Sequence, residues 1–151
     1  MPSRVPEVLD ALTAQLAALP ALAGVRVVDG PELGGGDDLE WVLVGFDGDP
    51  AGAFQAAQAA GGWASPVNTS REETWQVVCA VVVGRGDTAV RPARVRAYEI
   101  AASVEELLAL DPSLGLPSLE AAVDTSELAQ VQTGDGIQVR LLLTIGGRAF
   151  T

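Results

Sequence analysis

The side chains that most often carry enzyme chemistry are scarce in this sequence. It has no histidine, all nine basic residues are arginine, and Cys79 is its single cysteine. Serine-triad and Cys–His catalysis need histidine, zinc sites need histidine or several cysteines, and the Gly-x-x-x-x-Gly-Lys phosphate motif needs lysine. Cys79 lies in the apolar run WQVVCAVVVG, which predicts a buried, unreactive thiol. We therefore expect no enzymatic activity and no cofactor.

The best candidates for binding a hard cation are Asp47 and Asp49 in the segment FDGDP. Calcium takes about six to eight oxygen ligands, and only two carboxylates are close together here. We expect a turn stabilised by an aspartate side chain and no metal site. The adjacent pairs 72–73 and 105–106 are glutamates whose side chains diverge on a strand or a helix, so we expect both pairs to be solvated.

Length and charge indicate one acidic domain, residues 1–151. The formal net charge is −11, which argues against a nucleic-acid-binding surface and favours solubility. No apolar run approaches the ~20 residues that span a bilayer, so no membrane contact is expected. Glu7 and Asp10 interrupt any signal-peptide core, so no signal peptide is expected.

Hydrophobic periodicity predicts an α+β fold with a mostly antiparallel sheet and two helices on one face. Leucines at steps of three and four predict the first helix, and Ala93, Ala97, Ile100 and Val104 mark the second. The sequence Thr-Gly-Asp-Gly at 133–136 predicts a hairpin. The expected helices cover 5–20 and 88–110, and the expected strands cover 25–28, 39–44, 72–83, 119–123, 128–132 and 137–145.

A long loop is expected between the second and third strands, from residue 46 to 71. It contains an Ala/Gln-rich piece, 54–60, for which we predict a helical turn or two. Loops of this length inside a compact domain are usually functional, so we expect this one to contact a partner. The contact candidates on it are Asp47, Asp49, Trp63 and Arg71.

The remaining contact candidates are Arg91 and Arg94, which with Arg96 form the one basic cluster of the sequence. Residues 91 and 94 share one side of the expected helix, whereas 96 is rotated away. Ion pairing with nearby acids is one interpretation. A subunit or partner contact is the other, because arginine is enriched at protein interfaces.

Four segments of the chain, taken in order, resemble the tail terminator proteins of long-tailed (siphovirus-type) bacteriophages, in the form found in phages of actinobacterial hosts. These segments are the opening helix followed by VRVVDGP, the strand and turn LEWVLVGFDGDP, the strand–turn–helix that starts at ETWQVVCAVVVGRGD and closes at DPSLG, and the hairpin LAQVQTGDGIQVRLLLTIGGRAF. They span most of the 151 residues and exclude the 51–70 stretch.

The resemblance implies a structural role without an enzymatic step. Tail terminators are similar α+β domains that form a ring, here expected to be a homo-hexamer. The ring caps the tail tube protein, ends tube polymerisation and presents a surface to the head–tail connector or head-closure protein. The expected location is the tail–neck junction of the virion, after assembly in the host cytoplasm. Genomic DNA is expected to pass through the lumen without specific binding.

Two alternatives stay open at this point. The chain could be another neck component, a head-closure or tail-completion protein, which differs in binding the portal or adaptor rather than the tube. From a different class, it could be a small cytoplasmic ligand-binding domain, with Trp41, Trp63 and Trp75 lining a pocket.

Overall fold

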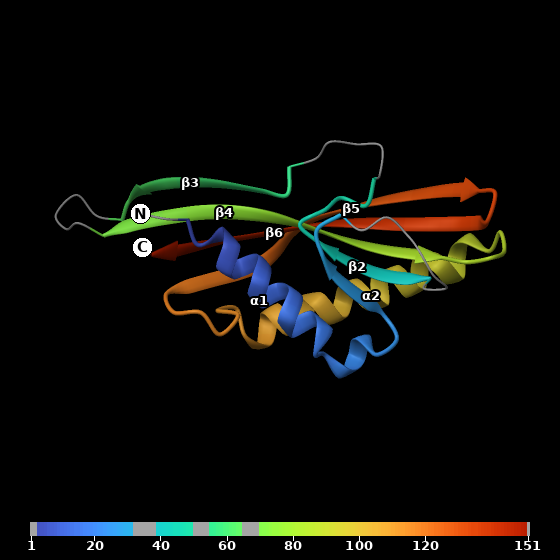
Figure 1. Cartoon of the computed structure of the whole chain (residues 1–151), viewed down its shortest axis with the longest axis horizontal. Helices are drawn as coiled ribbons and strands as arrows, with labels where there is room; N and C mark the ends of the chain where they lie inside the picture. The colour runs from blue at the N-terminus through green and yellow to red at the C-terminus, as the bar shows by residue number, and fades with distance from the viewer. Residues whose placement is uncertain (1–2, 32–38, 50–54, 65–69, 151) are drawn as a thin grey trace.

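A computed structural model of the chain describes residues 3–31, 39–49, 55–64 and 70–150. Two α-helices and six strands lie in these ranges, with a short 3₁₀ turn after the first helix (Figure 1). In chain order they are α1 (Val5–Ala17), η1 (Pro20–Leu22), β1 (Arg26–Asp29), β2 (Glu40–Val44), β3 (Ala57–Trp63), β4 (Arg71–Gly84), α2 (Val90–Leu110), β5 (Leu119–Thr133) and β6 (Gly136–Phe150).

The six strands form one mixed sheet in which β4 is central. The order is β1-β2-β4-β6-β5, and β1 with β2 is the one parallel pair among the described strands. β2 pairs with the second half of β4 and β3 with its first half, while β6 runs along the whole opposite edge of β4. One half of the sheet is therefore an antiparallel β3-β4-β6-β5 arrangement.

Both helices pack on the same face of this sheet (Figure 1). Alternate residues of β4, from Trp75 to Val83, point into the main core, as do alternate residues of β6 from Ile137 to Ile145. α1 buries Val8, Leu12 and Leu16, which share one face of that helix. The α+β class, the mostly antiparallel sheet and the common face of the two helices are confirmed.

The other face of the sheet carries a smaller apolar cluster. It consists of Trp41, Leu43, Ala80 and Val82, with Phe46 packed against it. The second half of β4 is buried on both faces of the sheet. Its side chains from Val77 to Val83 are accordingly almost all apolar. The central placement expected for this strand is confirmed.

Two expectations about local structure were wrong. The Ala/Gln-rich piece is not helical: residues 57–63 form β3, paired with β4, so the stretch between the second and third expected strands is not one continuous loop. The two strands expected at 119–123 and 128–132 are one strand, β5, which continues through a β-bulge between Val123 and Thr125. Much of 51–70 lies outside the described residues.

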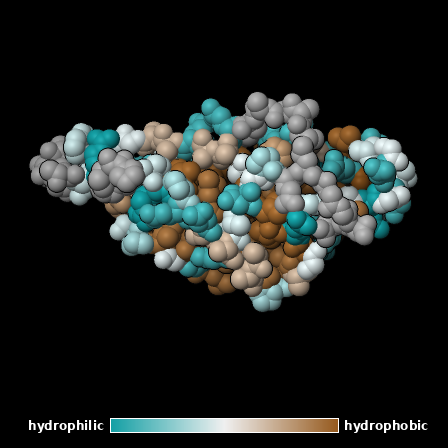
Figure 2. Space-filling model, in the orientation of Figure 1, coloured by the Kyte–Doolittle hydropathy of each residue, from teal (hydrophilic) through white to brown (hydrophobic). Residues whose placement is uncertain are grey.

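The surface mixes polar and apolar residues. Figure 2 shows apolar residues gathered over the middle of the view, interspersed with hydrophilic ones. No helix in the described ranges is long and apolar enough to cross a membrane.

Candidate functional site

Trp63, which is exposed, and Arg71, which is half-buried, form a cross-strand pair at the end of the β3–β4 hairpin. The two residues are register partners, and the Arg71 guanidinium carbon lies 4.5 Å from the centroid of the Trp63 ring. The Trp63 side chain is nevertheless 64% exposed. Arg71 also reaches over Gly61, where an added Cβ would lie 3.0 Å from its Nη2. Tryptophan and arginine dominate protein-interface hot spots, so this pair is the strongest contact candidate.

Trp63 belongs to an edge strand, β3, whose outward backbone groups can be identified. Hydrogen bonds from Val78 N–H to the Ala56 carbonyl and from Ala64 N–H to the Ser70 carbonyl flank β3. Antiparallel pairing alternates, so the even-numbered residues of β3 bond to β4 and the odd-numbered residues turn their amides and carbonyls away from it. Within the described chain, β3 pairs with no strand other than β4.

Nothing in the composition of β3 protects that edge. Its sequence, AQAAGGW, has no charged residue and no proline, and most of its residues are exposed. Natural edge strands usually carry lysine, proline or a bulge that blocks pairing with another chain. Within the part of the chain that the structure describes, the edge of β3 is therefore free to pair with another strand.

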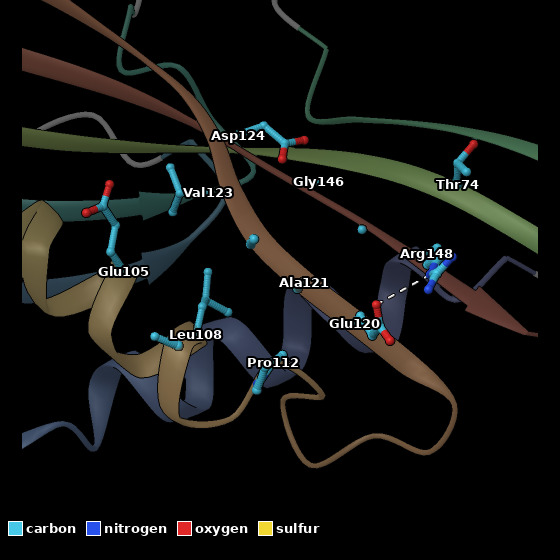
Figure 3. A pocket seen from close by; sticks show the side chains of 13 residues that line it. Thr74, Glu105, Leu108, Pro112, Glu120, Ala121, Val123, Asp124, Gly146 and Arg148 are labelled. Carbon is cyan, nitrogen blue, oxygen red and sulfur yellow. Dashed lines mark ion pairs between the residues drawn. The ribbon is translucent and has the colours of Figure 1, made fainter.

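A groove of about 780 Å³ follows the opposite edge of the same half-sheet, along the first part of β5 (Figure 3). In Figure 3, Glu105 and Leu108 of α2 lie on one side of β5, and Thr74 and Arg148 lie on the other. Small side chains, Ala109 among them, line much of its wall. The groove is thus lined by small apolar side chains together with a set of charged ones, here called its rim.

Acidic groups outnumber basic ones at this rim. Glu105, Glu120 and Asp124 line the groove, and Arg148 is its one basic lining residue. Arg148 is already paired, with its Nε 3.4 Å from a Glu120 carboxylate oxygen and its Nη1 3.9 Å from one of Glu72. The groove therefore favours a ligand with a positive charge.

Two glycines make room for the groove wall. An added Cβ on Gly146 would collide with the Asp124 carboxylate, and one on Gly147 would collide with the Trp75 ring and the Glu120 carbonyl. Asp124 stands at the β-bulge, which turns its side chain across the neighbouring strand. The Gly146-Gly147 step thus allows Trp75 to pack beneath β6.

The basic cluster on α2 is not a shared site. Arg96 pairs with Glu40 through two hydrogen bonds of 2.8 and 3.1 Å and also approaches Glu99, and this pairing raises the pKa of Arg96. Arg94 donates to the side chain of Gln130 on β5, at 3.1 Å. Arg91 is exposed in the first turn of α2. Ion pairing with nearby acids is confirmed for Arg96, whereas Arg94 pairs with an amide.

Asp47 and Asp49 form the expected turn. The Asp47 carboxylate accepts a hydrogen bond of 3.0 Å from the Asp49 amide, which is an Asx turn. Gly48 between them has a φ of +84°, and an added Cβ there would lie 2.8 Å from the Arg140 Cδ. This turn is distant in the fold from Trp63 and Arg71, because it follows β2 and packs on the second half of the sheet. The six contact candidates therefore do not form one surface.

The tryptophans and the cysteine are mostly core residues. Trp75 and Trp41 lie in clusters on opposite faces of the sheet, so with the exposed Trp63 they do not line a single pocket. Cys79 is fully buried in β4, and burial raises the pKa of its thiol to about 12. The expectation of an unreactive buried thiol is supported, and the solvation expected for the 72–73 pair was wrong at Glu73, which is buried.

Sequence reasoning missed the β3 edge and the β5 groove. The alternation that marks a strand is absent from AQAAGGW, because alanine and glycine carry little hydropathy contrast. A run of small, uncharged residues beside a tryptophan is the sequence feature that could have indicated β3. No protein-family model and no curated protein matches the sequence.

Proposed function

We propose that this chain is the subunit of a phage tail terminator, a ring that caps the tail tube, ends its polymerisation and joins it to the head connector. The observation that carries a protein-binding role is the exposed Trp63, stacked with Arg71, on the edge strand β3, which no other described strand covers. The resemblance of the four segments to tail terminators supplies the particular assembly.

Charge is compatible with a ring through which DNA passes. Six copies at −11 each carry a formal charge of −66. Acids facing the lumen would repel the phosphates of the genome, so that DNA passes without adhering. The proposal expects carboxylates rather than arginines on the inner surface of the ring.

The β5 groove is the observation that favours the ligand-binding alternative. Its volume of about 780 Å³ falls within the range of small-molecule sites. A ligand-binding domain would show saturable stabilisation by a small molecule and would function without self-association. The exposed tryptophan on the opposite edge has no role in that alternative.

Electron cryo-microscopy of the intact particle that carries this chain tests the proposal. A ring of this domain between the last tube ring and the head connector is the expected result. Density for the domain against the portal or adaptor would instead identify another neck protein. Its absence from the particle would overturn both assembly roles and leave the ligand-binding alternative.

A further inference from the structure

We infer that the β3 edge of one copy pairs with the β5 edge of the next, and that Trp63 and Arg71 then dock in the groove beside β5. This contact rests on the proposed ring and specifies how its subunits join. The occupant of the groove is accordingly a second copy of this chain.

Strand direction supports the contact. In the β3-β4-β6-β5 half of the sheet every neighbour is antiparallel, so β3 and β5 run in opposite directions. A second copy placed beside β5 in the same orientation presents a β3 that is antiparallel to it. The pairing pattern thus continues from copy to copy, and a heterologous contact of this kind closes into a ring when each step adds a rotation.

Both edges have backbone groups that point away from the sheet. On β3, Ala57, Ala59, Gly61 and Trp63 turn their amides and carbonyls outward. On β5, the Ala121 amide donates 2.8 Å to the Pro112 carbonyl, which shows that the odd-numbered residues of this stretch point away from β6. Because that amide is already bonded within the chain, the pairing with a second copy begins at Val123. Val123, the next outward residue, lies in the groove. Main-chain pairing of two edges is an established mode of association.

The faces of the sheet bring Trp63 and Arg71 to α2 of the neighbour. Both residues pair on the face that carries Glu73 and Trp75, which is the helical face. If the sheet continues, they meet the helical side of the β5 groove, formed by Glu105, Leu108 and Ala109.

The side chains that meet at that contact are complementary in polarity and charge. The Trp63 indole packs against the apolar wall of the neighbour's groove. The Arg71 guanidinium approaches the Glu105 carboxylate near the C-terminal end of α2, where the helix dipole also favours a cation. Leu110, 81% exposed at the end of α2, adds apolar area next to this wall. The acidic rim and the arginine are thus complementary in charge.

A backbone test uses proline at Ala59 in the full chain. Ala59→Pro removes an amide that faces away from β4, so the intramolecular ladder stays intact. Ala59→Val is the matched control, because it changes the side chain and keeps the amide. Sedimentation velocity is expected to show self-association in wild type and Ala59→Val, and association weakened about thirtyfold, as at an interface hot spot, in Ala59→Pro. Circular dichroism establishes that each variant is folded.

A charge test identifies the partner edge. Arg71→Glu and Glu105→Arg each place like charges together at the contact, so each variant alone is expected to associate weakly. Mixing the two restores opposite charges at every contact and is expected to restore association. A contact between two β3 edges would instead be insensitive to Glu105→Arg.

The inference is overturned if wild type stays monomeric at its highest soluble concentration, if Ala59→Pro associates like wild type, or if mixing the charge variants restores nothing. Those outcomes leave the terminator proposal standing, because the position of the domain in the particle tests that proposal separately. A ring at the tail–neck junction with unaffected Ala59→Pro would mean that the subunits join through other surfaces.

Discussion

The backbone amide of Arg4 donates a 2.9 Å hydrogen bond to the carboxylate of Glu73, a residue 69 positions away and 9% exposed. The Arg4 guanidinium in turn donates to the carbonyls of Pro117 and Phe150. The start of α1, the central strand, the approach to β5 and the end of β6 therefore meet at this one point.

Removal of the Glu73 carboxylate is expected to destabilise the fold. Glu73→Ala leaves the Arg4 amide without its acceptor, which costs about 1–3 kcal/mol. Glu73→Gln keeps an acceptor oxygen and is the control, expected to lose less. Urea unfolding followed by tryptophan fluorescence measures both. Equal losses in the two variants would mean that side-chain packing, rather than this hydrogen bond, is what matters at residue 73.

Gly147→Ala is expected to destabilise the protein by about 1–3 kcal/mol, the usual cost of overpacking a core. The added methyl group would collide with the Trp75 ring and the Glu120 carbonyl. Gly134→Ala, in the hairpin turn, is the matched control because its Cβ meets nothing within 4 Å. Thermal unfolding of the two variants beside wild type provides the comparison. A Gly147→Ala protein as stable as wild type would contradict the packing described for Trp75.

The buried thiol of Cys79 is expected to resist modification while the chain is folded. With its pKa raised to about 12, almost no thiolate exists near neutral pH, and full burial blocks the reagent. A chromogenic disulfide reagent should therefore react with Cys79 only as the protein unfolds. Cys79→Ala gives the background rate. Rapid labelling of the native protein would contradict this burial.

The same shift predicts a dependence of stability on pH. A raised native pKa means that the folded chain retains the Cys79 proton after the unfolded chain has lost it. This contribution is complete below the unfolded value of 9.0 and declines as pH rises towards about 12. Denaturant unfolding above pH 9 should show a smaller decline in Cys79→Ala than in wild type. An identical decline in the free energy of unfolding of the two proteins would contradict the raised pKa of Cys79.

The Arg96–Glu40 pair is expected to contribute about 0.5–1 kcal/mol to stability. It joins α2 to β2 through two hydrogen bonds, and both side chains are about 30% exposed. Arg96→Lys loses the two-pronged geometry and should recover only part of that energy. A double-mutant cycle with Glu40→Gln measures the coupling at low and high salt. A coupling that is absent at low salt would show that the pair contributes nothing.

The parts of the fold that were predictable from sequence have strong periodic signals. Leu12 and Leu16 marked the buried stripe of α1, and the alternation from Ile137 to Ile145 marked the face of β6 that packs on the helices. β4 was placed at the centre because its second half is apolar on both faces. Each of these signals is local, because it comes from the repeat of a helix or a strand.

The parts that were missed depend on partners distant in sequence. β3 has no alternation of its own and is a strand because β4 lies alongside it, and Glu73 is buried because Arg4 and the C-terminal strand close over it. The β-bulge after Val123 merged two expected strands into one.

The sequence by itself determined the fold class, the helical face of the sheet and the scarcity of groups for catalysis, since composition and periodicity are properties of the chain alone. Only the tertiary structure decided that Trp63 and Arg71 stack on an unprotected edge, and that a groove with an acidic rim follows the opposite edge. Edges and grooves arise from pairing between distant segments, and no local pattern records which strand is left without a neighbour.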